Sequence, residues 1–382
     1  MIPSLLLAVA FILLALYLWH LRQRPYAAVP FLLGIGLLTL TITIKVQDEN
    51  RTLAKQDVDT LLDHLSTTDL WRINEVDRAD ERLLLASTAS QALLRAKTWY
   101  PERAGAIDST LAVLAYFAAS PTNFPQWKRQ RSWDEQVFFL AHAGATLAHY
   151  QLATGNAGRA SELGRIGNHL GTRLIRSKYK HLPSRADEPF FRPADNAAAL
   201  YTLSLYERID SAGLLLPTYT DWSAYLTDEL YYEESRLPCA AFSTTNTCQL
   251  EPSAAATGLY IAYRAAAREE VETDIPYREW LHYFKGGIST PFTLSIRQDM
   301  RQDEQTRFCG LGSKPLKCGR YESAVALWAS AEYDGDYAYF RLFAGRLLGR
   351  WLNERPDYAA MSPAKRVEAL QGVAFWALGE GL

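Results

Sequence analysis

Three carboxylates stand close together in the segment SRADEPFFRPADNAAALYTLSLYERI, residues 184–209. Asp187 and Glu188 precede a proline and two phenylalanines, and Asp195 follows a second proline at the start of an apolar helical pattern. A carboxyl group held against aromatic rings can have a raised pKa, so Asp187 and Glu188 are candidate proton donors. Asp195 also stands where an N-cap residue would precede a helix, and a plain capping role is its alternative.

A histidine on a second apolar pattern could exchange protons with these carboxyls. His142 lies in the segment WDEQVFFLAHAGATLAHYQLATG, whose apolar residues recur with helical spacing. That spacing places Glu135, Phe138 and Phe139 on the same predicted helix face as His142. Core packing is the alternative for a single histidine on an apolar face.

Two aromatic positions complete the candidates. Tyr260, in TGLYIAY, follows Gly258, which leaves room beside the ring. Trp133 opens the cluster Trp-Asp-Glu ahead of the His142 pattern. Buried packing is the alternative for the tyrosine, and an ordinary helix start is the alternative for the cluster.

The four cysteines form two pairs of equal spacing, Cys239 with Cys248 and Cys309 with Cys318. Neither spacing matches the short Cys-x-x-Cys motifs of structural zinc sites, and the sequence shows no metal-ligand cluster or nucleotide-binding motif. We therefore expect neither metal nor organic cofactor. Two short-loop disulfides in an oxidising compartment fit the spacing better, and four unrelated free thiols are the alternative.

The N-terminal residues 1–45 differ from the rest. Two uncharged apolar runs, about residues 2–19 and 27–44, flank Arg22 and Arg24. Each run is just long enough to cross a bilayer, so we expect a transmembrane hairpin, with a cleaved signal peptide as the alternative. The loop arginines favour a cytoplasmic loop and an extracytoplasmic body, although positive charges after the second run weaken this count.

The remaining residues 46–382 read as one helical catalytic domain. The chain of 382 residues is 48% hydrophobic, enough for a large core, and its net charge of −2 with no basic stripe argues against nucleic acid as a partner. About twelve helical patterns follow one another, and strand signals are limited to TPFTLSI and CAAFS. This predicts an all-α fold, with paired helices wound into a toroid; a bundle or solenoid is the alternative.

Four segments, in order, resemble the linalool dehydratase-isomerase family: DEQVFFLAHAGATLAHYQLATG, DEPFFRPADNAAALYTLSLYERI, CAAFSTTNTCQLEPSAAATGLYIAY and GRYESAVALWASAEYDGDYAYFRLF. The resemblance covers roughly residues 77–346, and the N-terminal hairpin looks like that of the family's membrane-anchored linalool isomerase branch. It implies an (α/α)6 barrel, a homo-oligomer, and active-site roles for His142, Glu188 and Tyr260. Asp187 and Asp195 stand where the dehydratase-isomerase has two catalytic cysteines.

The absence of cysteine at those two positions leaves alkene-forming dehydratase activity weak at most, whereas carboxylates still suit an allylic hydroxyl shift. Such a shift needs an acid for the leaving oxygen, a dry pocket for an allylic cation, and a base for the returning water. Four aromatic side chains are candidates to line the substrate pocket and stabilise the cation: Phe190, Phe191, Phe139 and Trp133.

The sequence therefore predicts an isomerase that interconverts a tertiary and a primary monoterpene alcohol, linalool and geraniol. Its partners would be this small hydrophobic alcohol and the lipid bilayer. We expect it in a bacterial inner membrane, with the catalytic domain in the periplasm. A carbohydrate-active α/α-barrel enzyme, such as a glycosidase or uronate epimerase, and a membrane-tethered scaffold are the alternatives.

Overall fold

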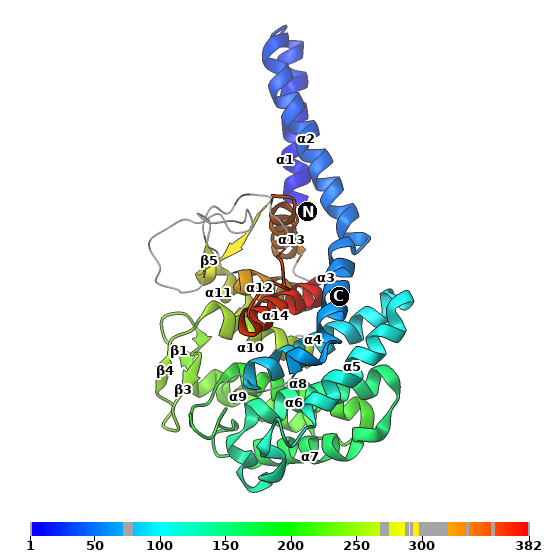
Figure 1. Cartoon of the computed structure of the whole chain (residues 1–382). Coiled ribbons are helices and arrows are strands. Elements are labelled where there is room, and N and C mark those ends of the chain that lie inside the picture. Colours follow the sequence, from blue (N-terminus) through cyan, green and yellow to red (C-terminus); the bar gives the residue numbers. More distant parts are fainter. Residues whose placement is uncertain are drawn as a thin grey trace.

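A computed structural model of the chain describes residues 2–71, 79–267, 275–286, 290, 293–297, 320–333, 336–352 and 356–380. Helices dominate these residues, as the all-α prediction requires (Figure 1). An apolar helical hairpin projects from a larger helical body, and the chain crosses from one to the other along a single long helix (Figure 1).

Six helices of the body contact one another in cyclic order, and we call them the ring helices. They are α4 (Ala79–Trp99), α6 (Val137–Thr154), α8 (Pro193–Asp210), α10 (Ala254–Ala266), α12 (Arg320–Glu332) and α14 (Pro363–Glu380). Each packs against the next in this order, and α14 packs against α4. The contacts between these helices therefore close on themselves.

A second set of helices lies outside the ring. These outer helices are α3 (Thr52–Leu65), α5 (Ala104–Ala118), α7 (Ala160–Arg176), α9 (Leu215–Glu229), α11 (Ile275–Phe284) and α13 (Asp336–Leu352). Each packs against at least one ring helix. Short 3-10 helices lie in the connections: η1 (Thr68–Trp71), η3 (Pro101–Arg103), η4 (Pro125–Lys128), η5 (Gln130–Glu135) and η6 (Ala157–Arg159).

Local sequence signals set the ends of several ring helices. The Ser253 hydroxyl accepts a hydrogen bond from the backbone N–H of Ala256 (3.3 Å) at the start of α10, as an N-cap does. Pro193 and Pro363 begin α8 and α14, where a missing N–H costs nothing. Gly155 ends α6 with a φ of +69°, a left-handed conformation that suits glycine.

Glycines let neighbouring helices approach closely. A Cβ atom on Gly144 of α6 would lie 2.5 Å from Cγ2 of Thr202 on α8, and one on Gly258 of α10 would lie 2.7 Å from Val325 of α12. A Cβ on Gly379 of α14 would lie 2.8 Å from Leu327 of α12. These three contacts involve five of the six ring helices and leave no room for a side chain.

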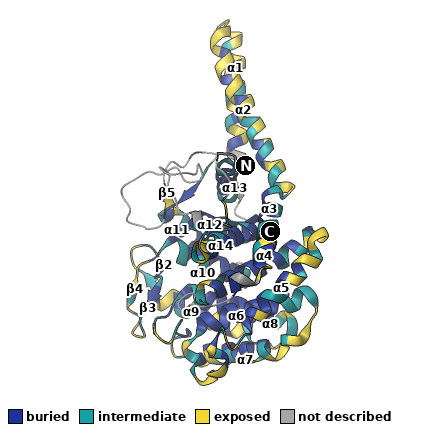
Figure 2. Cartoon of the chain, viewed as in Figure 1, coloured by how far each residue is buried: buried dark blue, intermediate teal, exposed yellow. Residues whose placement is uncertain are grey.

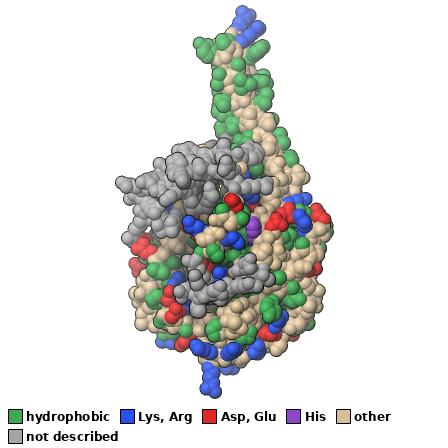
Figure 3. Space-filling view, in the orientation of Figure 1, with side chains coloured by type: hydrophobic (Ala, Val, Ile, Leu, Met, Phe, Trp, Pro, Cys, Tyr) green, Lys and Arg blue, Asp and Glu red, His purple; other side chains and the backbone are tan. Residues whose placement is uncertain are grey.

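Two N-terminal helices form the hairpin: α1 (Ile2–His20) and α2 (Arg24–Glu49). By length and composition α2 could cross a membrane, whereas α1 is apolar but shorter. Nearly all exposed large apolar side chains in the described part of the chain lie between Leu5 and Val46, and they cover the hairpin surface (Figures 2 and 3). The second helix runs past residue 45, the predicted boundary, and contacts α3 and α13 of the body.

A buried ionic cluster lies where the hairpin meets the body. Arg346 of α13 pairs with Asp57 of α3 and with Glu380 of α14, and Arg350 adds a contact of 2.9 Å to Asp57. All but Arg350 are buried, and burial raises the pKa of Glu380 to about 8. The cluster fixes three helices at the base of the hairpin.

The described residues contain three small antiparallel sheets. They pair β1 (Tyr231–Tyr232) with β2 (Leu237–Pro238), β3 (Ala241–Phe242) with β4 (Cys248–Leu250), and β5 (Lys285–Gly286) with β6 (Ser295–Ile296). The predicted disulfide between Cys239 and Cys248 is present at the β3–β4 hairpin, with a Cα–Cα distance of 5.9 Å. The predicted pair Cys309 and Cys318 lies outside the described residues.

The close approach of α6 and α8 can be tested with Gly144→Ala. The added methyl group would meet Thr202, whose hydroxyl is held by a 2.7 Å hydrogen bond to the carbonyl of Ala141, so we expect a loss of about 1–3 kcal/mol in unfolding free energy. Gly372→Ala is the matched control because nothing lies within 4 Å of its Cβ position. Denaturant unfolding in detergent should show unchanged or higher stability for Gly372→Ala. Equal stability of both variants would contradict the close contact.

Candidate functional site

His142 lies on the inner side of α6, and its side chain is only 2% exposed. Its ring centroid is 4.6 Å from that of Phe138 and 6.0 Å from that of Tyr263, on the facing helix α10. Burial, assisted by the positive charge of Arg185, lowers its pKa to about 3. The imidazole is therefore neutral at physiological pH, and its buried Nδ1 atom has no hydrogen-bond partner among the described residues.

Tyr263 faces His142 across the ring. Its side chain is 2% exposed, and its ring packs edge-on against Trp328 at 4.9 Å and beside Tyr201 at 5.8 Å. Burial raises the pKa of Tyr263 well above its ordinary value, so the phenol keeps its proton. The buried hydroxyl makes no well-formed hydrogen bond among the described residues, but the side chain of Ser87 of α4 lies close enough to lower its pKa through a hydrogen-bond interaction.

Asp195 contributes a third buried polar group. The N-cap of α8 is Arg192, so Asp195 lies inside the first turn, and its alternative role as the N-cap is wrong. Burial raises the pKa of Asp195, while Ser184, Arg185 and Arg192 act in the opposite direction. The buried Oδ2 atom of Asp195 has no hydrogen-bond partner in the described structure. The negative charge of Asp195 also raises the pKa of Tyr263.

The segment before α8 is held across the starts of two ring helices. The carbonyls of Pro183 and Ser184 accept hydrogen bonds of 3.0 and 3.2 Å from the first two backbone N–H groups of α6. The Asn196 side chain accepts from the Leu182 N–H (2.9 Å) and donates to its carbonyl (3.1 Å). Backbone groups that a helix start leaves unpaired are thus used to fix Ser184 near Asp195.

Arg185 lies on the solvent side of Phe138 and His142. Its guanidinium lies 4.5 Å from the ring centroid of Phe138, which in turn packs against His142. Its Nε donates to the Asp80 carboxylate of α4 at 2.5 Å. The side chains of Arg185 and Asp80 are 29% and 37% exposed, so this ion pair forms the solvent-facing layer above the buried histidine.

A fully paired network lies beside the three unpartnered groups. The His149 ring contacts Ser90 Oγ at 2.7 Å through Nδ1 and the Tyr201 hydroxyl at 2.9 Å through Nε2. Ser90 Oγ also lies 2.8 Å from the Ser87 carbonyl, and when it donates there His149 donates from Nδ1 and accepts from Tyr201. Burial lowers the pKa of His149 to about 3. This network fixes Tyr201 against Tyr263.

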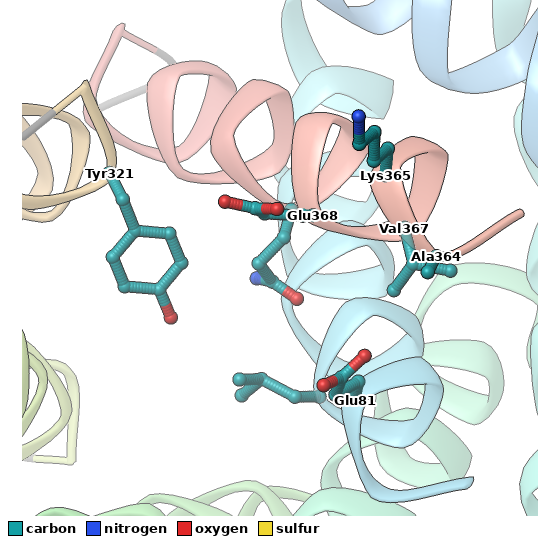
Figure 4. A pocket seen from close by; sticks show the side chains of 8 residues that line it. Glu81, Tyr321, Ala364, Lys365, Val367 and Glu368 are labelled. Atoms are coloured by element: carbon teal, nitrogen blue, oxygen red, sulfur yellow. The ribbon is translucent and has the colours of Figure 1, made fainter. Parts of the chain in front are cut away.

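A cavity of about 340 Å³ opens at the starts of α4, α12 and α14. Its lining includes Glu81, Leu84, Tyr321, Glu368 and Gln371. Figure 4 shows Tyr321 on one side and Glu81 and Lys365 on the other. The ring of Tyr321 packs edge-on against Phe375 at 5.1 Å. A negative charge on the Tyr321 phenolate would raise the pKa of Tyr263. The cavity therefore adjoins the buried polar group.

The structure places the two predicted proton donors outside an apolar pocket. Asp187 is exposed, and Glu188 is half-buried with an ion pair of 2.6 Å to Arg192. The expectation that aromatic rings enclose these carboxyls is therefore wrong. The turn from Ser184 to Phe190 closes through a backbone hydrogen bond of 3.0 Å and carries both carboxyls at the surface.

The predicted aromatic residues, all buried except the half-buried Phe190, belong to other clusters. Tyr260 accepts a hydrogen bond from Arg264 (3.0 Å) and packs against Trp222 of α9 at 5.9 Å. The other positions likewise contact outer elements: Phe139 packs on Trp127 (5.3 Å), Trp133 on His169 (5.4 Å) and Phe191 on Tyr179 (5.2 Å), while Phe190 is half-buried. Phe138, Tyr201 and Tyr263 take the inner positions, and sequence spacing alone does not distinguish them.

No protein-family model matches the chain, and no curated protein sequence matches it significantly. Within the described residues, no group of three or more His, Cys, Asp or Glu side chains is arranged to hold a metal ion. The geometry itself provides a neutral imidazole, a neutral phenol and a carboxyl with a raised pKa in a buried, aromatic setting. Such groups can donate and accept protons away from bulk water.

The depressed pKa of His142 predicts how stability depends on pH. Below about pH 6.5 an unfolded chain binds a proton at this residue that the folded chain does not bind until about pH 3, so stability is lost as pH falls through this window. His142→Asn should reduce that slope by up to about 1.4 kcal/mol per pH unit, measured by unfolding between pH 7 and 4. His64→Asn, which changes a half-buried histidine in the last turn of α3, is the control. Identical slopes for wild type and His142→Asn would refute the buried, neutral state.

Proposed function

We propose that this protein is a membrane-anchored isomerase that shifts a hydroxyl group between the tertiary and primary ends of an allylic monoterpene alcohol, such as linalool and geraniol. The observation that carries the proposal is the set of three buried polar atoms that make no well-formed hydrogen bond in the described structure: Nδ1 of His142, the Tyr263 hydroxyl and Oδ2 of Asp195, the last two with the side chains of Ser87 and Ser184 close by. Buried polar atoms are normally paired, so such a set indicates a place where substrate polar groups bind.

The first step would be acid-assisted loss of water. The raised pKa of Asp195 increases the fraction of its carboxyl that carries a proton, and this proton would pass to the substrate hydroxyl. The C–O bond then breaks, which releases water and leaves an allylic cation and the Asp195 carboxylate. The rings of Phe138, Tyr201 and Tyr263 offer π faces for the cation, while the Tyr263 hydroxyl can hold the released water.

The second step would return water to the other end of the allyl group. Addition of water gives a protonated alcohol, which is a much stronger acid than an imidazolium even when the histidine pKa is about 3. Nδ1 of His142 can therefore take the proton despite its weak basicity. Transfer of that proton to the Asp195 carboxylate restores the starting state, so the reaction consumes no other reagent.

The architecture supports this proposal. The cyclic contacts of the ring helices, with outer helices packed against them, support the proposal of an (α/α)6 barrel. The exposed apolar surface of α1 and α2 suits a two-helix anchor in lipid, and an anchor would hold the site near a substrate that partitions into the bilayer. The disulfide between Cys239 and Cys248 favours a periplasmic body, and the predicted homo-oligomer is part of the same proposal.

One observation favours a carbohydrate-active enzyme as the second candidate. The cavity lining includes two carboxylates, Glu81 and Glu368, together with Lys365 and Gln371, and polar groups of this kind can bind sugar hydroxyls. Against it, the buried groups deeper in the ring are surrounded by Phe138, Tyr201 and Trp328. Incubation of membranes with linalool, geraniol or oligosaccharides separates the two candidates by their products.

The acid role of Asp195 can be tested with Asp195→Asn, which keeps the shape but removes the titrating proton. Turnover of linalool to geraniol, followed by gas chromatography, should fall by roughly 10²–10⁴-fold with unchanged helix content. Asp187→Asn is the matched control because it changes an exposed carboxyl of the same segment, and it should retain nearly full activity. The reverse ranking would assign the acid to Asp187 instead. No conversion by the wild-type membranes would reject the proposed reaction.

The extracytoplasmic placement makes a separate prediction. Protein isolated from membranes under non-reducing conditions should give a cross-linked peptide pair that contains Cys239 and Cys248, measured by mass spectrometry. Cys248→Ser should release Cys239 as a free thiol and serves as the control. Free thiols at both positions in the wild-type protein would contradict an oxidising location.

A further inference from the structure

Gln371 links the cavity to the interior of the ring. Its side chain, on α14, is 4% exposed and belongs to the cavity lining. Its Nε2 donates a hydrogen bond of 2.7 Å to the Thr88 hydroxyl of α4. Its Oε1 is buried and has no hydrogen-bond partner among the described residues. One half of this amide is thus fixed and the other half is open.

The hydrogen bonds of Thr88 determine which half is open. Its hydroxyl donates to the Leu84 carbonyl one helical turn earlier, at 2.9 Å. A hydroxyl has a single hydrogen, so the Thr88 oxygen can only accept from Gln371. With the Thr88 hydrogen directed to the Leu84 carbonyl, the amide presents its NH2 group to Thr88, and its carbonyl oxygen remains as an unpaired hydrogen-bond acceptor.

The walls around this acceptor restrict what can bind there. Leu84 and Val367 are apolar, and burial raises the pKa of Tyr321, so its phenol is neutral. Figure 4 shows that Glu81 and Glu368, the carboxylates of the cavity, lie among the same lining residues. An anionic ligand would meet an acceptor and two carboxylates against the single cation of the described lining, Lys365. A neutral molecule with a hydroxyl donor and an apolar body fits these walls better.

We propose that this cavity is a binding site for a neutral, largely apolar alcohol, and that Oε1 of Gln371 accepts the hydrogen bond from its hydroxyl. Gln371 would then be a specificity-determining residue that selects alcohols over ethers and hydrocarbons of the same shape. The choice of a terpene alcohol as the ligand rests on the proposed function. The proposal that the site recognises the hydroxyl group of the ligand rests only on the orientation of the Gln371 amide.

Binding of geraniol and geranyl methyl ether to the detergent-solubilised full chain tests this site. The ether keeps the carbon skeleton and the oxygen but has no donor hydrogen. Tryptophan fluorescence titration should show tighter binding of geraniol than of the ether. Gln371→Leu should weaken geraniol binding by roughly 3- to 10-fold and leave ether binding unchanged, because one hydrogen bond is lost.

Gln91→Leu is the matched control. Gln91 is equally buried on α4 and also has unpartnered amide atoms, but it does not belong to the cavity lining. This variant should leave both affinities unchanged. Thr88→Val keeps Gln371 but removes the acceptor that fixes its amide, so it should lower the preference for geraniol, and circular dichroism checks that each variant is folded.

Equal binding of the two ligands by the wild type, no binding of geraniol, or an unchanged preference in Gln371→Leu would each overturn the site. Geraniol binding that depends on Gln371, without any conversion to linalool, would support the site and reject the proposed reaction. If Gln371→Leu still converts linalool to geraniol at the wild-type rate and still prefers geraniol over the ether, the proposed binding site is rejected but the proposed reaction is not.

Discussion

The close approach of neighbouring ring helices is the constraint on which the rest of the structure depends. Glycines at the contacts of α6 with α8, of α10 with α12 and of α14 with α12 leave no room for a Cβ atom. Side chains from six helices must then share a narrow interior. Most of these side chains are buried, and a polar group among them must find a partner or remain without one.

This burial sets the electrostatic character of the candidate site. His142 and His149 experience the same burial, and both have pKa values of about 3, but only His149 has both ring nitrogens paired. The paired histidine stabilises the core, whereas His142 keeps one ring nitrogen unpaired. Burial lowers the pKa of both histidines alike. His149 and His142 therefore differ in their hydrogen bonds, and only His142 has a ring nitrogen that is available to a substrate.

The same packing connects the body to the apolar hairpin. Asp57, Arg346 and Glu380 are buried together at the junction, and the Tyr339 hydroxyl donates to Asp48 near the end of α2 at 2.7 Å. Removal of one charge from such a cluster would leave another unpaired in a dry interior, at high cost. The ionic cluster therefore joins α3, α13 and α14, and the Tyr339–Asp48 hydrogen bond links α13 to the end of α2.

The sequence by itself determined the helical class, the apolar hairpin, the Cys239–Cys248 pairing and the presence of His142 on a buried helix face. These features depend on residues near one another in the chain, through helical spacing and local pairing. Only the tertiary structure decided that Tyr263 faces His142 while Tyr260 packs outward, and that Asp187 is exposed. Positions three apart on a helix differ by only about 60° around its axis, so spacing alone cannot tell which of the two points into the ring. The neighbouring helices determine which tyrosine points into the ring, because the residues that contact each side chain come from segments far away in the sequence.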